Sequence, residues 1–434
     1  MGAMPMTTRP DAHALTHLED LGHFVQAAPS PFHAAAEVVR RLDVAGFVRQ
    51  DETEPWDAAP GGHYLVRGGA VVAWRVPEGA GVHSGFRIVG THTDSPAFQV
   101  KPAPDSAAAG YQLVNVEVYG GLLRNSWLDR ELGLAGRLVT VAGQEVLVRT
   151  GPLMRIPQLA IHLDRTVNDG LVLDPQQHLH PVWSVGRPEA SVLGHVAALA
   201  GLAAYDIAGF DLRSFDVQPP AVFGAEEEFF ASARLDNLLS VHAGVTALLD
   251  TTPASGGGDI QVLACFDHEE VGSSTRAGAA GPVLEDVLVR TGHALGADAD
   301  GLRRMYARST VMSSDGGHAV HPNYPERHDP AHQPVLNGGP MLKVNASQRY
   351  ATDAAGAALW TRACRAAGVK GQVIASNNAV PCGSTIGPIT ATRLGLLTVD
   401  VGAPILSMHS AREMCGSADP YALRRVLAAY WTGA

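Results

Sequence analysis

The chain has few cysteines. Its 434 residues include only four, and no two of them have the Cys-x-x-Cys spacing of a metal or redox motif. Cys265 lies within an apolar stretch, where a small thiol is an ordinary core residue. This pattern argues against a disulfide framework, and we therefore expect a reducing, cytoplasmic location.

The chain also lacks long apolar runs and an excess of basic residues. No apolar run approaches the ~20 residues of a membrane-spanning helix, and the first six residues contain no apolar core of a signal peptide. The formal net charge is -11, whereas non-specific nucleic-acid binding requires a basic face. We expect neither a membrane nor a nucleic acid as a partner. An acidic substrate remains possible, because a local basic pocket can lie on an acidic protein.

The composition is that of a loop-rich α/β protein. Hydrophobic residues make up 46% of the chain, and 47 glycines and 28 prolines favour this class over a helical bundle. The length suits two to three domains. Buried-type strands and amphipathic helices alternate near both ends of the chain, which predicts an α/β catalytic domain.

The middle of the chain has a different pattern. Four segments alternate apolar and polar residues like antiparallel strands with one face in water, and a helix is predicted at residues 198–205. The predicted strands cover residues 111–119, 136–141, 145–149 and 158–162. We therefore predict a β-rich domain at residues 103–228, inserted into a catalytic domain formed by residues 1–102 and 229–434.

A pair of adjacent carboxylates follows one of the predicted buried strands. The strand at residues 259–266 runs directly into Asp267-His268-Glu269-Glu270. Sites in open α/β sheets lie outside the carboxyl ends of strands, and successive residues there point in different directions. One glutamate could therefore bind a metal while the other faces a substrate. An isolated Glu-Glu pair would more often be two exposed loop residues.

Further candidate ligands lie at strand ends or in loops, although each has an ordinary alternative. Asp236 precedes an apolar helical run and could be an N-cap. Asp94 lies two residues after His92 and could accept the second ring N–H of that histidine. Together the candidates provide imidazoles and carboxylates without a thiolate, which suits Zn²⁺, Co²⁺ or Mn²⁺. The metal-ligand candidates are His92, Asp236, Glu269 or Glu270, Asp315 and His409.

The donor set is large enough for two metal ions that share one carboxylate. Such a pair activates water and polarises a carbonyl group, and a remaining carboxylate can act as general base. Two other residues are weaker candidates. His162 ends a short apolar segment and could simply bind backbone, while Lys343, in a strand-like run, could lie along the surface or supply positive charge for an acidic substrate group.

Several long motifs, in the same order over nearly the whole chain, resemble the M18 aminopeptidases, the aspartyl aminopeptidase family. This resemblance implies a mixed-sheet zinc-exopeptidase catalytic domain with helices on both faces, and an inserted β-rich dimerisation domain. The motifs are residues 90–96 (GTHTDSP), 234–237 (RLDN), 267–273 (DHEEVGS), 315–324 (DGGHAVHPNY) and 408–410 (MHS).

The resemblance also implies a role for each matching residue and two zinc ions per subunit, with Co²⁺ or Mn²⁺ as alternatives. Glu269 would be the general base. The zinc ligands would be His92 and Asp315 for one ion, Glu270 and His409 for the other, and Asp236 for both. The supporting residues would be Asp94, which orients His92; His162, donated by a neighbouring subunit; and Lys343, in the substrate pocket.

The activity implied by this resemblance is removal of an N-terminal residue, preferably Asp or Glu, from peptides with a free N-terminus. The implied assembly is a homododecamer that encloses its active sites. Two alternatives keep the fold. One is an enzyme with another preference, for neutral residues or for deacylation, and the other is a non-catalytic cargo or assembly protein.

Overall fold

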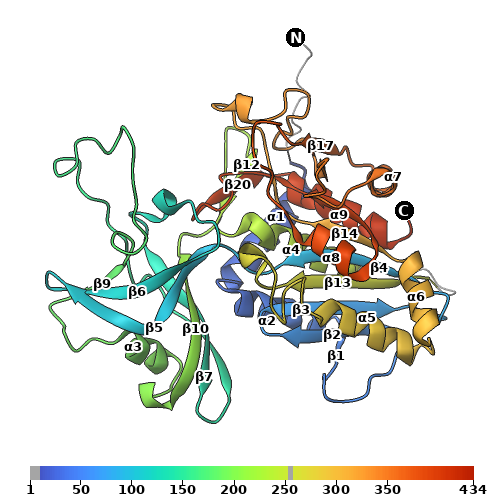
Figure 1. Ribbon diagram of the computed structural model, residues 1–434, viewed down its shortest axis with the longest axis horizontal. Helices are drawn as coiled ribbons and strands as arrows, with labels where there is room; N and C mark the ends of the chain where they lie inside the picture. Colours follow the sequence, from blue (N-terminus) through green and yellow to red (C-terminus); the bar gives the residue numbers. More distant parts are fainter. Residues whose placement is uncertain (1–9, 253–257) are drawn as a thin grey trace.

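A nine-stranded mixed sheet forms the centre of the larger lobe of the molecule (Figure 1). The computed structural model describes residues 10–252 and 258–434, so the expectation for the first six residues lies outside the described part. In spatial order the strands are β1 (Val48–Arg49), β2 (Gly61–Arg67), β3 (Ala70–Val76), β13 (Ile260–Phe266), β4 (Phe86–His92), β14 (Thr310–Ser314), β18 (Leu397–Gly402), β16 (Met341–Val344) and β17 (Gln372–Ala375).

The central strands β13, β4, β14 and β18 are parallel, and β13 is buried along its whole length. Parallel strands covered on both faces are expected to be apolar at every position, as β13 is. Its residues alternate between two apolar clusters: Leu263 and Cys265 belong to one, and Val262 and Ala264 to the other. Both faces of the sheet are therefore covered, which confirms the predicted α/β class.

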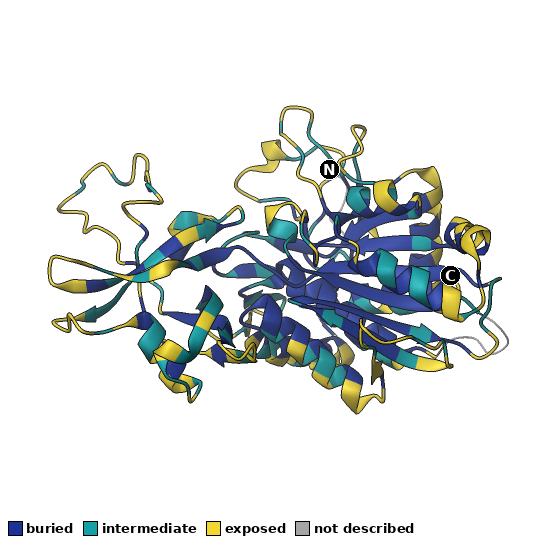
Figure 2. Cartoon of the chain, turned by 60° about the horizontal axis from the view of Figure 1, so that its bottom comes forward, coloured by how far each residue is buried: buried dark blue, intermediate teal, exposed yellow. Residues whose placement is uncertain are grey.

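The first cluster is covered by five helices and the second by three. The first group is α1 (Ala12–Ala27), α2 (Pro31–Val44), α4 (Leu235–Asp250), α7 (Ala354–Ala367) and α9 (Asp419–Trp431). The second is α5 (Val283–Ala294), α6 (Ala299–Arg308) and α8 (Ile386–Leu394). Figure 2 shows the resulting buried strands beneath helices whose outer faces are exposed.

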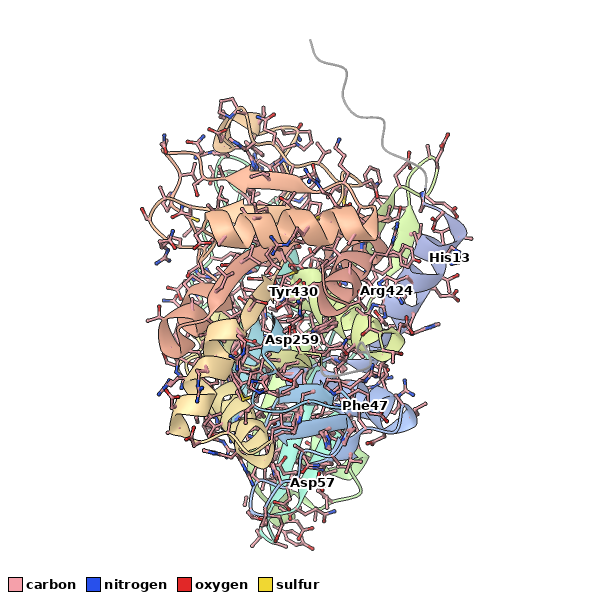
Figure 3. All side chains as sticks on the ribbon, turned by 90° about the vertical axis from the view of Figure 1, so that its right-hand side faces the viewer. His13, Phe47, Asp57, Asp259, Arg424 and Tyr430 are labelled. Carbon is pink, nitrogen blue, oxygen red and sulfur yellow. The ribbon has the colours of Figure 1, made fainter. Side chains whose placement is uncertain are left out.

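Local sequence fixes where several of these helices begin and how they are attached. Ser30 accepts a hydrogen bond from the backbone of His33, and Pro31 occupies the first position of α2. At the other end of the chain, the buried Tyr430 of α9 donates to the Thr310 carbonyl at 2.8 Å (Figure 3). The last helix is thereby joined to the first residue of β14.

A second, antiparallel sheet lies beside the first lobe (Figure 1). It has its own apolar core, in which Phe98 packs edge-on against Trp127. The predicted boundary at residues 102/103 falls inside β5 (Ala97–Ala108), and the division into two domains stays a prediction. The strand order is β8 (Glu145–Arg149), β7 (Leu132–Thr140), β10 (Ile207–Asp216), β5 (Ala97–Ala108), β6 (Tyr111–Tyr119) and β9 (Val182–Val185).

Two secondary-structure predictions for this region are wrong. Residues 158–162 form no strand but an exposed loop and turn, because nothing among the described residues pairs with them or covers their apolar side chains. The helix predicted at residues 198–205 is instead α3 (Val192–Leu199), capped by Ser191. It ends before Gly201, whose φ of +70° is left-handed and cannot continue a helix.

A small third sheet links the two lobes and carries part of the site described below. Its strands are β11 (Ala221–Phe223), β12 (Phe229–Ser232), β20 (Glu413–Gly416), β19 (Pro404–Leu406) and β15 (Gly317–His318). Among the described residues, none of the helices combines the length and apolarity needed to cross a membrane.

Candidate active site

Most of the predicted site residues lie at the carboxyl ends of parallel strands. His92 is the last residue of β4, Asp315 directly follows β14, and Glu269 and Glu270 follow β13 in a short turn. Parallel strands present these ends at one edge of the sheet, which explains why residues far apart in the sequence meet there. Asp236 joins them from the start of α4.

Asp236 lies between two histidines. Its Oδ1 is 3.3 Å from Nε2 of His92 and its Oδ2 is 3.5 Å from Nε2 of His409. Each histidine also faces a second carboxylate: Asp315 Oδ1 is 3.6 Å from His92 Nε2, and Glu270 Oε2 is 3.4 Å from His409 Nε2. The five side chains therefore form two sets that share Asp236.

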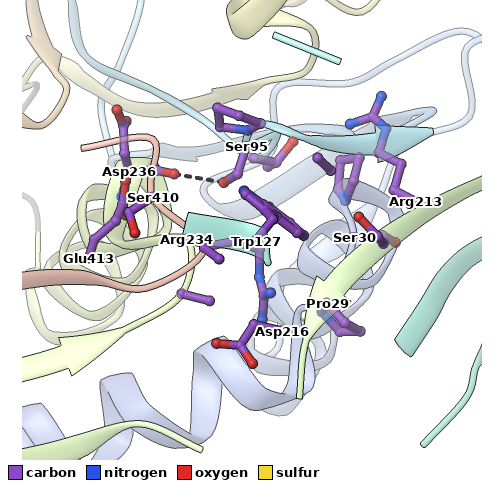
Figure 4. Close-up of a pocket in the computed structure, with 17 residues that line it drawn as sticks. Pro29, Ser30, Ser95, Trp127, Arg213, Asp216, Arg234, Asp236, Ser410 and Glu413 are labelled. Carbon is purple, nitrogen blue, oxygen red and sulfur yellow. Dashed lines mark hydrogen bonds between the residues drawn. The ribbon is translucent and has the colours of Figure 1, made fainter. Parts of the chain in front are cut away.

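Glu413 of β20 supports this arrangement, and sequence reasoning missed it. Its Oε2 accepts the backbone N–H of Asp236 at 2.8 Å, and its Oε1 accepts that of His409 at 2.7 Å. Ser95 Oγ donates to the Asp236 carbonyl at 2.7 Å (Figure 4). Because both partners of Glu413 are backbone groups, no residue pattern in the sequence indicates its position.

Asp94 ties His92 to the two glutamates. The Nδ1 of His92 is 3.0 Å from the Asp94 carbonyl oxygen and 3.4 Å from its Oδ1. The same carboxylate accepts the backbone N–H groups of Glu269 and Glu270 at 3.0 and 3.1 Å. Burial alone would raise the pKa of Asp94, but the hydrogen bond and the charge of His92 lower it to about 2. Asp94 is therefore an anion that fixes the turn after β13.

The residues of this cluster fit a divalent metal centre. Asp236 Oδ1 and Glu270 Oε1 are buried and accept no hydrogen bond among the described residues, and burying unpaired charge is costly. Burial also raises the pKa of Glu270 well above its usual value. Donor atoms of His92, Asp236 and Glu270 lie within 4.8 Å of one another. A bound cation would supply the missing partner, and this mixed N/O donor set is one that zinc accepts.

Glu269 is next to this cluster but differs from Glu270. Its carboxylate makes no hydrogen bond or ion pair within the described part of the chain, and it is only partly buried. Burial raises its pKa to about 7; His92 opposes this effect, while the neighbouring carboxylates of Asp315 and Asp236 add to it. A carboxyl group that titrates near neutrality can accept and return a proton.

The remaining two predicted residues occupy different positions. Lys343 of β16 is buried below the site, where its Nζ donates to the Gly316 carbonyl at 2.6 Å and lies 3.8 Å from Asp315 Oδ2. His162 is not brought to the cluster of its own chain. It lies in the exposed segment between β8 and β9.

Comparison with known proteins identifies the family. The model of the family described as aminopeptidase I zinc metalloprotease (M18) matches residues 24–431. A probable M18 family aminopeptidase 2 of Streptomyces coelicolor is 53% identical over 421 residues, which cover 95% of this chain and 97% of the relative.

Solved structures agree with this assignment. The structure of the Ape4 and Nbr1 complex contains a chain 34% identical to this one, with a TM-score of 0.93 and coverage of 97% of this chain and 86% of the other. The mApe1 dodecamer of S. cerevisiae has a TM-score of 0.84 at 29% identity, and covers 96% and 97% of the two chains. The chain therefore belongs to the M18 family of zinc metalloprotease aminopeptidases, and it is a hydrolase.

Proposed function

We propose that this enzyme removes an N-terminal residue, preferably Asp or Glu, from peptides with a free N-terminus, and that it uses two zinc ions per chain. Co²⁺ or Mn²⁺ could take their place. The observation that carries the proposal is the position of Asp236, with one oxygen toward His92 and the other toward His409, each histidine having a carboxylate of its own.

In this proposal each metal-binding residue has a defined place. His92 and Asp315 would hold one ion, Glu270 and His409 would hold the other, and Asp236 would contribute an oxygen to each. The bound ions would supply Lewis acidity, which activates water and polarises a carbonyl group. Asp94 orients His92, since its carbonyl oxygen lies 3.0 Å from the Nδ1 of that ring.

Glu269 is the proposed general base. It takes a proton from the attacking water and returns it to the amine that leaves when the peptide bond breaks. Its partly open position beside the cluster, with its carboxylate free of hydrogen bonds among the described residues, supports this role. Burial raises the pKa of this carboxyl group in the metal-free chain, which favours its acting as a proton acceptor.

Lys343 is the proposed partner of the acidic substrate side chain. An ammonium group has three N–H donors, and the Gly316 carbonyl accepts one of them. The remaining donors could bind a carboxylate close to Asp315. A charge-assisted hydrogen bond of this kind contributes about 1.5–3 kcal/mol, which would favour an acidic residue over a neutral one by roughly 10- to 100-fold.

We further propose a homododecamer in the cytoplasm. Most of the large apolar side chains that are exposed in the single chain belong to residues 103–228, as expected of a surface covered by other subunits. Leu159, Ile161 and Leu163 surround His162 in this region. Such a position would allow His162 to enter the site of a neighbouring subunit.

Hydrolysis of aminoacyl anilides tests the proposal. With zinc, the Asp and Glu anilides should be cleaved with a higher kcat/KM than the Leu anilide, and a chelator should abolish cleavage until zinc is restored. Preferred cleavage of Leu anilide or of an N-acyl substrate would instead support a neutral-residue aminopeptidase or a deacylase. Absence of turnover by zinc-loaded protein would support a non-catalytic cargo or assembly role.

A further inference from the structure

The turn at the end of β6 contacts both halves of the proposed metal centre. Tyr119 is the last residue of this strand of the six-stranded sheet, and its hydroxyl donates to Asp94 Oδ2 at 2.8 Å. Two residues later, the Gly121 carbonyl lies 2.9 Å from Nδ1 of His409. The intervening Gly120 has a φ of +73°, and a Cβ there would lie 3.0 Å from Cβ of Glu270. A larger residue in this turn would be strained by the positive φ and would press on Glu270.

Tyr119 completes the set of donors around Asp94. One oxygen of that carboxylate accepts the Glu269 N–H and faces Nδ1 of His92, while the other accepts the Glu270 N–H and the Tyr119 hydroxyl. A carboxylate has about four acceptor sites, so these contacts fix both of its oxygens. Tyr119 is 8% exposed, and burial raises the pKa of its hydroxyl, which remains protonated as a donor.

The guanidinium group of Arg213, in β10, packs on the face of the Tyr119 ring. Its guanidinium carbon lies 3.7 Å from the ring centroid, and the residue is 4% exposed. Its Nε and Nη1 have no hydrogen-bond partner among the described residues. A buried cation without an acceptor is costly. The ring face and the charges of the nearby carboxylates of Asp94 and Asp267 offset that cost. Ring and guanidinium thus restrict each other's orientation.

We propose that Tyr119, held by Arg213, is a positioning residue that fixes Asp94 and, through it, the His92 imidazole in the orientation needed for metal binding. The inserted sheet is thereby coupled to the metal centre. This inference rests on the proposed two-metal function. Removing a partner that orients a metal-binding histidine typically lowers metal affinity or activity by about 10- to 100-fold.

The test is zinc affinity of the full chain, measured by competition with a chromophoric chelator. Tyr119→Phe removes only the hydroxyl, and we expect it to weaken zinc binding about 10- to 100-fold and to lower kcat with little change in KM. The metal-free variant should still fold and should unfold at a slightly lower temperature, because Asp94 loses one donor while the ring still packs on Arg213. Tyr111→Phe, at the exposed start of the same strand, is the matched control and should change neither quantity.

A second pair of variants tests the role of the cation. Arg213→Met should reproduce the loss of zinc affinity, and Arg213→Lys should restore part of it, because lysine keeps a cation at the ring face. Wild-type zinc affinity in Tyr119→Phe would overturn the inference, as would a loss of affinity matched by an equal loss of stability in the metal-free form. Failure of the proposed function would give a different result from failure of this inference. In that case the wild-type chain itself would bind no zinc, or it would hydrolyse substrate without zinc.

Discussion

Glu269 and Glu270 are adjacent in the sequence, yet their surroundings suit different tasks. The side chain of Glu270 is 3% exposed and lies 3.4 Å from His409. The backbone N–H of Glu269 donates to Asp94, whereas its carboxylate accepts no hydrogen bond from the described residues and is only partly buried. Asp94 accepts the N–H groups of both residues, so the same anion holds the proposed ligand and the proposed base in their relative orientation.

Replacing the base should separate catalysis from metal binding. Glu269→Gln keeps the size of the side chain but cannot accept the proton, so we expect kcat to fall by about 10²–10⁴ or more at unchanged zinc content. Glu270→Gln is the comparison variant and should lose zinc as well. Steady-state kinetics with elemental analysis of both proteins checks this, and a fully metallated Glu269→Gln enzyme with near wild-type turnover would rule out the mechanism.

Removing the buried ammonium group should change specificity more than turnover of neutral substrates. In Lys343→Met the apolar part of the side chain is retained and the charge is lost. We expect the ratio of kcat/KM for Asp anilide over Leu anilide to fall by roughly 10- to 100-fold, in keeping with one charge-assisted hydrogen bond. An unchanged ratio would show that Lys343 only orients the Gly316 carbonyl.

At the scale of elements, the packing of α1 on α4 depends on a buried pair of imidazoles. His17 and His242 have ring centroids 4.6 Å apart, and His242 Nε2 lies 2.7 Å from the Asp20 carboxylate. His17 is 9% exposed and its Nε2 has no partner among the described residues. Burial, followed by repulsion from His242, lowers the pKa of His17 from 6.5 to about 2.

This pair should make the fold less stable in mild acid. Between about pH 2 and 6.5 the unfolded chain binds a proton at His17 that the folded chain does not, so stability is lost as the pH falls below 6.5. The loss from this residue between pH 7 and 5 is about 2 kcal/mol. His17→Leu should remove that part of the pH dependence in urea unfolding, whereas His13→Leu, at an exposed position of α1, should not. Identical pH profiles for His17→Leu and the wild type would contradict this account.

The sequence predicted strands best where the alternating pattern of a segment coincides with its pairing to neighbouring strands. The strands predicted at residues 111–119 and 145–149 have the bounds of β6 and β8. The strand prediction for residues 158–162 is wrong, because their apolar side chains are exposed in the single chain and do not pack in a sheet. Helix α6 was not predicted, although Asp298 caps its start and the buried Leu302, Met305 and Tyr306 have helical spacing.

The sequence indicated the side chains of the candidate site, but not the residues that hold those side chains in place. Residues that follow buried strands, such as His92 and Asp315, are marked by position, and the structure brings them together. Tyr119 and Arg213 act on the site through contacts distant in the sequence, and Glu413 joins the backbone of the nearby His409 to that of the distant Asp236. Such contacts depend on the tertiary arrangement of the strands, which local patterns do not specify.

At the scale of the whole molecule, the exposed apolar segment around His162 predicts an assembly. Replacing Leu159 and Ile161 with Ser should weaken subunit contacts and shift sedimentation toward smaller species, because both side chains are exposed in the single chain. Activity should fall with assembly if His162 acts in a neighbouring site. His162→Ala should lower kcat without changing sedimentation. Dissociated subunits with full activity would contradict the proposed role of His162.

The proposed two-metal centre is tested most directly by counting zinc ions per chain with elemental analysis of dialysed protein. The wild-type enzyme should contain two. His92→Ala and His409→Ala should each retain one, because each histidine belongs to a different set of ligands around Asp236. A single zinc in the wild-type enzyme, or a zinc content unaffected by the loss of His409, would contradict the account.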